Sequence, residues 1–233
     1  LHSDWSTPNI LAMTYVAGVP IERVTEEPQE IRDQIAKDLI DLTLHELFSF
    51  GVMQTDPNFA NYLYQPDYQR IALLDFGATH KISLPVVQFY HQLMLAGFAG
   101  DDATLEETME GIGFIDENTK DSQRKQLVHM VKFVFETLQE DRYLDFADTK
   151  LATHLQDLAI SLAKDGFIPP PVPIDVLLLQ RKIGGMFLLA AKLAARVNVV
   201  SLVADRLKDT VPSYKTNRSF QINDNSRQIT DEA

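Results

Sequence analysis

The sequence predicts a mainly α-helical domain with one small β-hairpin and a polar tail. Apolar residues recur at helical spacing after residue 28 and again from residue 84 onward. Between these regions, 61–64 and 70–74 are short apolar segments separated by a turn, which predicts the hairpin. Residues 209–233 are rich in Asn, Ser, Thr, Asp and Gln, which predicts a mobile tail. A chain of 233 residues is long enough for one sizeable core.

Each predicted element has a local signal. Residues 9–16 form an apolar run typical of a short buried strand, followed by a turn at Gly18. The first helix, over about 28–50, has a Pro in its first turn and Gly51 as its C-terminal cap. Further helices are expected at about 84–98, 102–111, 118–139, 147–165 and 173–207.

Two adjacent glycines, Gly184 and Gly185, lie inside the last predicted helix. As exposed residues they would destabilise it by roughly 1 kcal/mol each relative to Ala. We therefore expect a close helix–helix contact at this point.

Composition and charge exclude several classes of function. The net charge of −12 and pI of about 4.8 disfavour nucleic acids and anionic lipid as partners. The absence of Cys excludes disulfide frameworks, thiolate nucleophiles and Cys-based zinc sites. The most apolar region, 174–200, is interrupted by four basic residues, which indicates a core helix rather than a membrane span. We expect no nucleic-acid partner and no transmembrane segment in this chain.

Two short segments carry the candidate chemistry. Asp56-Pro-Asn-Phe-Ala-Asn61 places an Asp and an Asn five positions apart, and Asp75-Phe-Gly77 follows fourteen residues after Asn61. Protein kinases have this order: a catalytic loop with Asp and Asn, a hairpin, and an Asp-Phe-Gly whose Asp holds magnesium. An isolated Asp-Phe-Gly is more often an ordinary turn after a strand. Its spacing from Asp56 and Asn61 is what favours the kinase interpretation.

In this interpretation each polar residue has a role in ATP-dependent phosphoryl transfer. Asp75 would be the main Mg²⁺ ligand, and Asn61 would add a neutral oxygen to a second metal. Asp56 would orient the acceptor hydroxyl or water and take its proton. The expected cofactors are therefore ATP and Mg²⁺. At the hinge between lobes, the adenine edge would meet backbone groups of Thr14, Tyr15 and Val16.

The full fold class that the sequence predicts is the C-terminal, large lobe of a protein-kinase-like fold, with a hinge strand and a small β-hairpin. We expect the small lobe to be absent from these residues, because no Gly-rich phosphate loop or strand Lys precedes Asp56. The expected large lobe spans 1–208, followed by the tail. Within it lie a hinge at 9–20, catalytic and metal-binding loops at 52–83 and a helical region at 84–208.

The segment after Gly77 bears on the substrate. Only Ala78-Thr-His-Lys-Ile-Ser83 separates this glycine from the next predicted helix. Ordinary protein kinases have a long segment here that forms the platform for a peptide substrate. The sequence therefore argues against a conventional peptide substrate.

Gln54-Thr-Asp-Pro-Asn-Phe-Ala-Asn61 and Ala72-Leu-Leu-Asp-Phe-Gly-Ala-Thr79 together resemble the UbiB (AarF, COQ-kinase-like) family of atypical protein-kinase-like ATPases. The resemblance covers about residues 10–205, including 15–20, 168–171 and 181–185. It implies an ATP-dependent atypical kinase or ATPase that supports ubiquinone (coenzyme Q) biosynthesis. The matching positions make Asp56 the catalytic Asp and Asn61 and Asp75 the metal ligands. Thr14 departs from the family, whose members often have an acidic residue at the hinge.

The same resemblance implies further partners and a location. Prenylated quinone precursors or quinone-biosynthesis proteins would be the partners besides ATP. The expected location is cytoplasmic, with peripheral attachment to the inner membrane as an option. Two other functions stay open at this point. One is a small-molecule phosphotransferase of kinase-like fold, such as an aminoglycoside or choline kinase. The other is a non-catalytic nucleotide-sensing scaffold of a lipid-biosynthetic complex, against which the intact Asp56, Asn61 and Asp75 argue.

Overall fold

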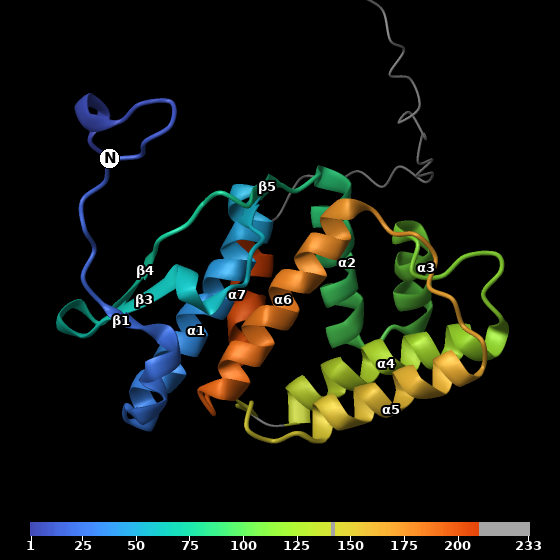
Figure 1. Ribbon diagram of the computed structural model, residues 1–233. Coiled ribbons are helices and arrows are strands. Elements are labelled where there is room, and N and C mark those ends of the chain that lie inside the picture. The colour runs from blue at the N-terminus through green and yellow to red at the C-terminus, as the bar shows by residue number, and fades with distance from the viewer. Residues whose placement is uncertain (141–142, 210–233) are drawn as a thin grey trace, which may run out of the picture.

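Helices dominate the computed structural model, which describes residues 1–140 and 143–209 (Figure 1). The α-helices are α1 (Gln29–His45), α2 (Leu84–Ala99), α3 (Asp102–Ile112), α4 (Asp121–Glu140), α5 (Lys150–Lys164), α6 (Ile174–Lys192) and α7 (Val199–Asp209). A π-helical turn over Glu46–Phe50 extends α1, and the chain then turns at Gly51 with φ +62°. The predicted helices before residue 165 are therefore confirmed, with ends that differ by a few residues.

Short antiparallel strands build the part of the molecule that precedes α2. They are β1 (Val19–Pro20), β2 (Val52–Gln54), β3 (Tyr62–Gln65), β4 (Arg70–Leu73) and β5 (Thr79–Lys81), and a further pair is β6 (Leu144–Asp145) with β7 (Arg196–Val197). β3 and β4 form the predicted hairpin, with Tyr62 opposite Leu73, and β1 joins it at the other edge of β3. β2 pairs with β5, a pairing that the sequence did not predict.

The main core lies where α1, α6 and α7 run side by side (Figure 1). Its fully buried side chains include Ile35, Leu47, Met53, Leu179 and Leu189. Each such apolar side chain contributes roughly 1.5–3 kcal/mol when buried. A smaller cluster joins α2, α3 and α4 through Ala96, Leu105, Met109, Ile115 and Val128. α6 is thus a central helix that also reaches the loops before α2.

The prediction of one helix over 173–207 is wrong. The chain leaves helical geometry after α6, because Ala194 has φ +46° and β7 pairs with β6. The carbonyls freed by this break are bonded by α1: Gln29 Nε2 donates to Ala194 O at 2.8 Å, and Arg32 Nη1 donates to Leu193 O at 2.6 Å. Tertiary hydrogen bonds therefore outweigh the local helical pattern.

The predicted buried strand over 9–16 is not formed, whereas the hinge role of 9–20 stays a prediction. The only pairing near it is a single bridge between Thr7 and Ile10, and the strand after it, β1, is two residues long. A strand needs a neighbouring strand to bond its backbone along its length, whereas this segment has only isolated bonds, such as the one from the His2 amide to the Ala12 carbonyl at 2.9 Å. The segment, dark blue in Figure 1, extends away from the helices, and its large apolar side chains are exposed.

Two expectations concern the ends of the chain and the membrane. The tail predicted over 209–233 lies, from residue 210 on, outside the described residues. None of the helices in the described part of the chain is both long and apolar enough to cross a bilayer.

Candidate active site

Strand pairing brings the three predicted polar residues to one corner of the molecule. Asp56 follows β2, Asn61 precedes β3, and Asp75 follows β4. The Leu74 amide donates to the Asn61 carbonyl at 3.0 Å, so the chain before Asp75 lies against the end of the Asp56 loop, residues 55–61. Gln54 Nε2 donates to the Asp75 carbonyl at 3.3 Å. Three segments that are separate in sequence are therefore bonded to one another.

The Asp56 carboxylate is held by a donor on each oxygen. Asn61 Nδ2 donates to Oδ2 at 3.1 Å, within the same loop. Arg181 of α6 contacts Oδ1 through Nη2 at 3.2 Å. The Arg181 side chain is 60% exposed, so this ion pair is a weak restraint. The two contacts fix the orientation of the Asp56 carboxylate beside the amide of Asn61.

Asp75 and Asn61 offer oxygen atoms suited to a divalent cation. Asp75 Oδ1 accepts from the Gly77 amide at 2.7 Å, and the residue is exposed. Among the described residues, no donor bonds Asp75 Oδ2 or Asn61 Oδ1, so both are available as ligands. Among the described residues, no group of three or more His, Asp or Glu side chains is arranged to hold a metal ion. Mg²⁺ suits such a sparse oxygen site, because it keeps several waters and takes phosphate oxygens as ligands.

A buried ion pair lies next to the Asp56 loop. Lys182 of α6 is 1% exposed and Glu46 is 6% exposed, with Lys182 Nζ 3.6 Å from Glu46 Oε2. Lys182 Nζ also donates to the hydroxyl of Tyr62 at 2.9 Å, and Glu46 Oε1 accepts from the Gln54 amide at 3.2 Å. Burial raises the pKa of the Glu46 carboxyl, and the nearby Lys182 and the Gln54 amide only partly offset this. Sequence reasoning missed this pair, whose one signal is a Lys inside an apolar helix.

The paired glycines of α6 have a different role from the predicted one. A Cβ on Gly185 would lie 2.1 Å from the Cβ of Pro57, the residue after Asp56. A Cβ on Gly184 would meet open space. The expected helix–helix contact is therefore wrong: the close approach is between α6 and the Asp56 loop.

The N-terminus of α6 holds the segment after Asp75-Phe-Gly77. His80 Nε2 lies 2.9 Å from Asp175 Oδ1, and the Ser83 amide donates to Asp175 Oδ2 at 2.8 Å. Burial acts to raise the pKa of Asp175, but the bonds from Ser83 and His80 outweigh it and lower the pKa. α6 thus contacts both the Asp56 loop and the chain that follows Asp75.

The predicted adenine-binding residues are not joined to this corner. Thr14, Tyr15 and Val16 lie in the extended segment before β1, and Tyr15 is 88% exposed. Thr14 Oγ1 lies 3.0 Å from His2 Nε2. No hydrogen bond between described residues connects the three to Asp56 or Asp75. Their contact with adenine stays a prediction.

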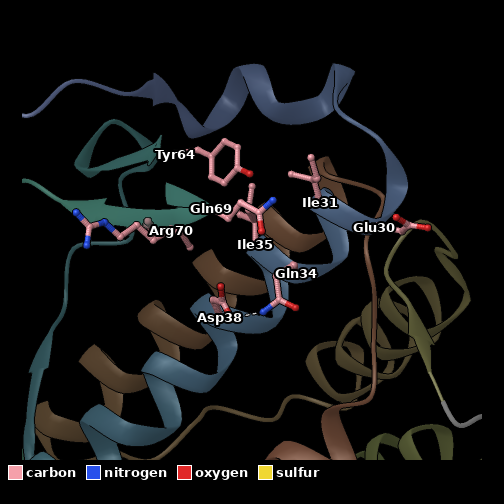
Figure 2. Close-up of a pocket in the computed structure, with 9 residues that line it drawn as sticks. Glu30, Ile31, Gln34, Ile35, Asp38, Tyr64, Gln69 and Arg70 are labelled. Carbon is pink, nitrogen blue, oxygen red and sulfur yellow. Dashed lines mark hydrogen bonds between the residues drawn. The ribbon is translucent and has the colours of Figure 1, made fainter. Parts of the chain in front are cut away.

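A separate small pocket lies between α1 and the turn end of the hairpin (Figure 2). Its volume is about 210 Å³, and its lining includes Gln34, Asp38, Tyr64 and Arg70. Burial raises the pKa of Asp38, although the Gln34 side chain and Lys37 partly offset this. The pocket adjoins Arg70 and Gln69, whereas the candidate active site lies at the opposite end of the same hairpin.

Comparison with known proteins agrees with the motifs. A model of the ABC1 atypical kinase-like domain matches residues 1–109. The chain is 32% identical over 199 residues to atypical kinase coq-8, mitochondrial, of Caenorhabditis elegans, covering 84% of this chain and 26% of that protein. Atypical kinase COQ8B, mitochondrial, of Danio rerio is 30% identical, with 87% and 32% covered. Atypical kinase COQ8, mitochondrial, of Saccharomyces cerevisiae is 29% identical, with 85% and 40% covered. The chain thus spans between a quarter and two fifths of the length of these relatives.

A solved structure shows the same fold. The chain matches Rv3197 of Mycobacterium tuberculosis, solved in complex with erythromycin, with a TM-score of 0.60 and 21% identity. The match covers 81% of this chain and 46% of that one. The predicted kinase-like, mainly helical fold class is confirmed. By its kinase-like domain and its relatives, this chain belongs to the UbiB/COQ8 family of atypical kinases.

Proposed function

We propose that this chain provides the catalytic and metal-binding loops of an ATP-dependent atypical kinase or ATPase. The observation that carries the proposal is the hydrogen bond from Asn61 Nδ2 to Asp56 Oδ2, with Asp75 on the adjoining segment. A structural turn would need none of these side chains, whereas phosphoryl transfer needs a base and oxygen ligands in one corner.

Asp75 and Asn61 would bind the metal, and Asp56 would act as the base. Asp75 Oδ2 and Asn61 Oδ1 would hold Mg²⁺, which when bound neutralises charge on the phosphates of ATP. Asp56 would accept a proton from the acceptor hydroxyl or from water. Arg181 Nη2 contacts Asp56 Oδ1 at 3.2 Å, which would help to hold the carboxylate of the base in place.

The acceptor is more consistent with a small molecule or a lipid than with a peptide. Between Gly77 and α2 lie only the turn, β5 and two further residues, and β5 is paired with β2. No long segment is left to form a peptide platform. The COQ8 names of the relatives support a role in ubiquinone biosynthesis, with quinone precursors or the proteins of that pathway as partners. A peripheral site at the inner membrane fits relatives that are named mitochondrial.

The test is Asp75→Asn in the full-length protein. ATP hydrolysis should fall by about two orders of magnitude or more, because the charged metal ligand is lost while the shape of the side chain is kept. The matched control is Asp67→Asn, on the exposed turn of the hairpin, which should hydrolyse ATP at the wild-type rate. Wild-type turnover in a folded Asp75→Asn protein would show that Asp75 is not the magnesium ligand.

A further inference from the structure

Residues 181–185 of α6 make three contacts to the Asp56 loop and to Tyr62, the residue that follows it. Arg181 pairs with Asp56 on the exposed side. Lys182 donates to Tyr62, the residue that follows Asn61. Gly185 lies against Pro57, so closely that a methyl group would overlap it.

The buried pair of Lys182 and Glu46 is bonded to both ends of that loop. Glu46 Oε1 accepts from the amide of Gln54, two residues before Asp56. Lys182 Nζ donates to the hydroxyl of Tyr62, one residue after Asn61. Since Lys182 and Glu46 are 1% and 6% exposed, water does not compete for these bonds. The loop of residues 55–61 is therefore fixed at its two ends by one buried cluster.

The contact at Gly185 fixes the middle of the loop. Pro57 lies directly on the helix surface, where only the absence of a side chain leaves room for it. The neighbouring Gly184 has open space around it, so the need for glycine is specific to position 185.

We propose that Lys182 and Gly185 are positioning residues that set where the Asp56 carboxylate lies. Neither would touch ATP or the acceptor, and both act through the loop. The effect of these two residues on the rate of ATP hydrolysis rests on the proposed function, but their effect on the position of the loop does not. Phosphoryl transfer depends on the positions of the catalytic groups, so a displacement of the loop by about 1 Å should greatly reduce the rate of the reaction.

The primary test compares Gly185→Ala with Gly184→Ala in the complete protein. Both changes give the same gain in helix propensity, but only the first adds a methyl group against Pro57. In Gly185→Ala, hydrogen exchange of the amides in 52–62 should speed up about tenfold. The kcat for ATP hydrolysis should fall at least tenfold, with the KM for ATP within twofold of wild type. Gly184→Ala should match the wild type in all three measurements.

The outcomes separate this proposal from the proposed function. Equal exchange of residues 52–62 in the two alanine variants would overturn the positioning role. A wild-type protein that does not hydrolyse ATP would overturn the proposed function, while the exchange measurement would still decide the role of Gly185.

A second pair of variants covers the case in which Gly185→Ala does not fold. Tyr62→Phe removes only the hydroxyl that accepts from Lys182, and its control is Tyr64→Phe, two residues along the same strand and equally buried. In Tyr62→Phe, hydrogen exchange of the amides in 52–62 should become about threefold or more faster, and kcat should fall about threefold or more. Both quantities should remain at the wild-type level in Tyr64→Phe. Identical behaviour of the two variants would show that the Lys182 contact does not position the loop.

Discussion

Lys182 is buried to 1% exposure, and its two partners explain how the fold tolerates it. The hydroxyl of Tyr62 accepts one hydrogen bond, and the Glu46 carboxylate lies 3.6 Å away. Glu46 Oε2 has no hydrogen bond of its own. Placing two charges in an apolar interior costs several kcal/mol, which their attraction only partly offsets. Such a pair is better explained by the position it gives to the loop than by a gain in stability.

Lys182→Met should lower the free energy of unfolding by about 3–5 kcal/mol at pH 8, because Glu46 would remain buried without a cation. Burial already raises the pKa of Glu46, and losing Lys182 removes the charge that counteracts it. A carboxyl whose folded pKa lies above its unfolded value stabilises the fold when protonated, and that stabilisation is lost as pH rises through the folded pKa. The deficit should therefore shrink as pH falls from 8 to 5, measured by urea unfolding.

The control for this variant is the double change Lys182→Met with Glu46→Gln. Neither position is ionisable in the double variant, so the difference in unfolding free energy between Lys182→Met and the double variant should be larger at pH 8 than at pH 5. A pH-independent deficit in the single variant would show that Glu46 is not the group left uncompensated.

Single residues differ in how well the sequence predicts them. The proximity of Asn61 and Asp75 followed from spacing, because a hairpin of the predicted length brings its two ends together, and Asp56 lies only five residues before Asn61. Lys182 and Glu46 gave no such signal, since they meet only through the packing of α6 beside the end of α1. The contact between Gly185 and Pro57 could likewise not be predicted from the sequence, although the glycine itself is visible there.

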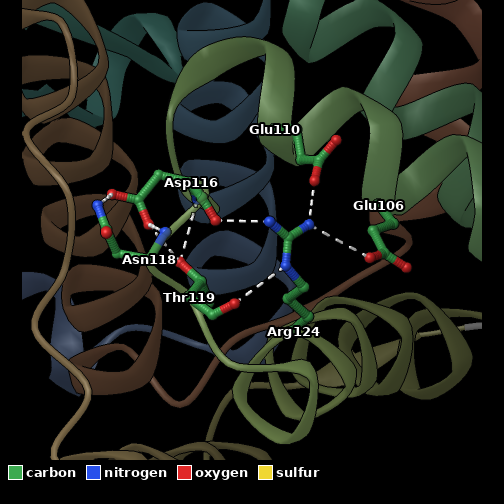
Figure 3. A network of polar contacts seen from close by, with 6 residues as sticks. All are labelled: Glu106, Glu110, Asp116, Asn118, Thr119 and Arg124. Carbon is green, nitrogen blue, oxygen red and sulfur yellow. Dashed lines mark hydrogen bonds and ion pairs between the residues drawn. The ribbon is translucent and has the colours of Figure 1, made fainter.

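Helices were predicted from periodicity, but their ends are set by side chains from elsewhere. α4 begins at Asp121 rather than at residue 118, because the Asp116 carboxylate accepts hydrogen bonds from the backbone amide and side chain of Asn118 and from the Thr119 hydroxyl. Arg124 secures this turn: its guanidinium bonds the carbonyls of Asp116 and Thr119 and pairs with Glu106 and Glu110 of α3 (Figure 3). The break between α6 and α7 has a similar origin in Gln29 and Arg32 of α1. No local pattern contains these partners.

Gly97→Ala should disrupt the packing of α2 against α4. A Cβ at this position would lie 2.2 Å from the ring of Phe135, which is itself 8% exposed. Overpacking of this kind costs about 1–3 kcal/mol, against a gain of at most ~1 kcal/mol in helix propensity. The matched control is Gly111→Ala in α3, where nothing lies within 4 Å of the added methyl group. Urea unfolding should show Gly97→Ala less stable than wild type and Gly111→Ala equal or more stable; the reverse order would contradict the contact.

The whole molecule has a candidate catalytic corner on a helical body, but the segment predicted to meet the nucleotide exposes its large apolar side chains. Residues 9–16 expose Ile10, Leu11, Met13 and Tyr15 to 50% or more. The sequence before Asp56 has no Gly-rich loop and no strand Lys to pair with phosphates. The candidate catalytic corner was predictable from local spacing, whereas a strand at the predicted hinge depends on a neighbouring strand, which residues 1–140 and 143–209 do not provide.

These 233 residues alone should therefore bind Mg-ATP weakly, with a dissociation constant well above the micromolar range. The adenine would meet only an exposed segment, and the phosphates would meet Mg²⁺ ligands without a paired Lys. Isothermal titration calorimetry measures this directly, with the Asp75→Asn chain as the control for binding through the metal. Micromolar affinity for the wild-type chain would mean that the nucleotide site has been placed wrongly.

Residues 1–208 should not bind anionic vesicles strongly, even though a role near quinone precursors would place the protein at a membrane. The net charge of the whole chain is −12, and an anionic surface repels it, whereas each Lys or Arg near such a surface contributes only about 1 kcal/mol of attraction. The feature that could oppose this is the apolar side of α6, where Ile174, Leu177 and Leu188 are 59%, 49% and 63% exposed.

Flotation at moderate salt with anionic and with neutral vesicles separates the charge repulsion from the apolar attraction. Weak flotation with both is expected, and attachment would then depend on other segments or on protein partners. Strong flotation with neutral vesicles, lost in Leu177→Ser with Leu188→Ser, would instead make this side of α6 a membrane-binding surface beside Arg181 and Asp56.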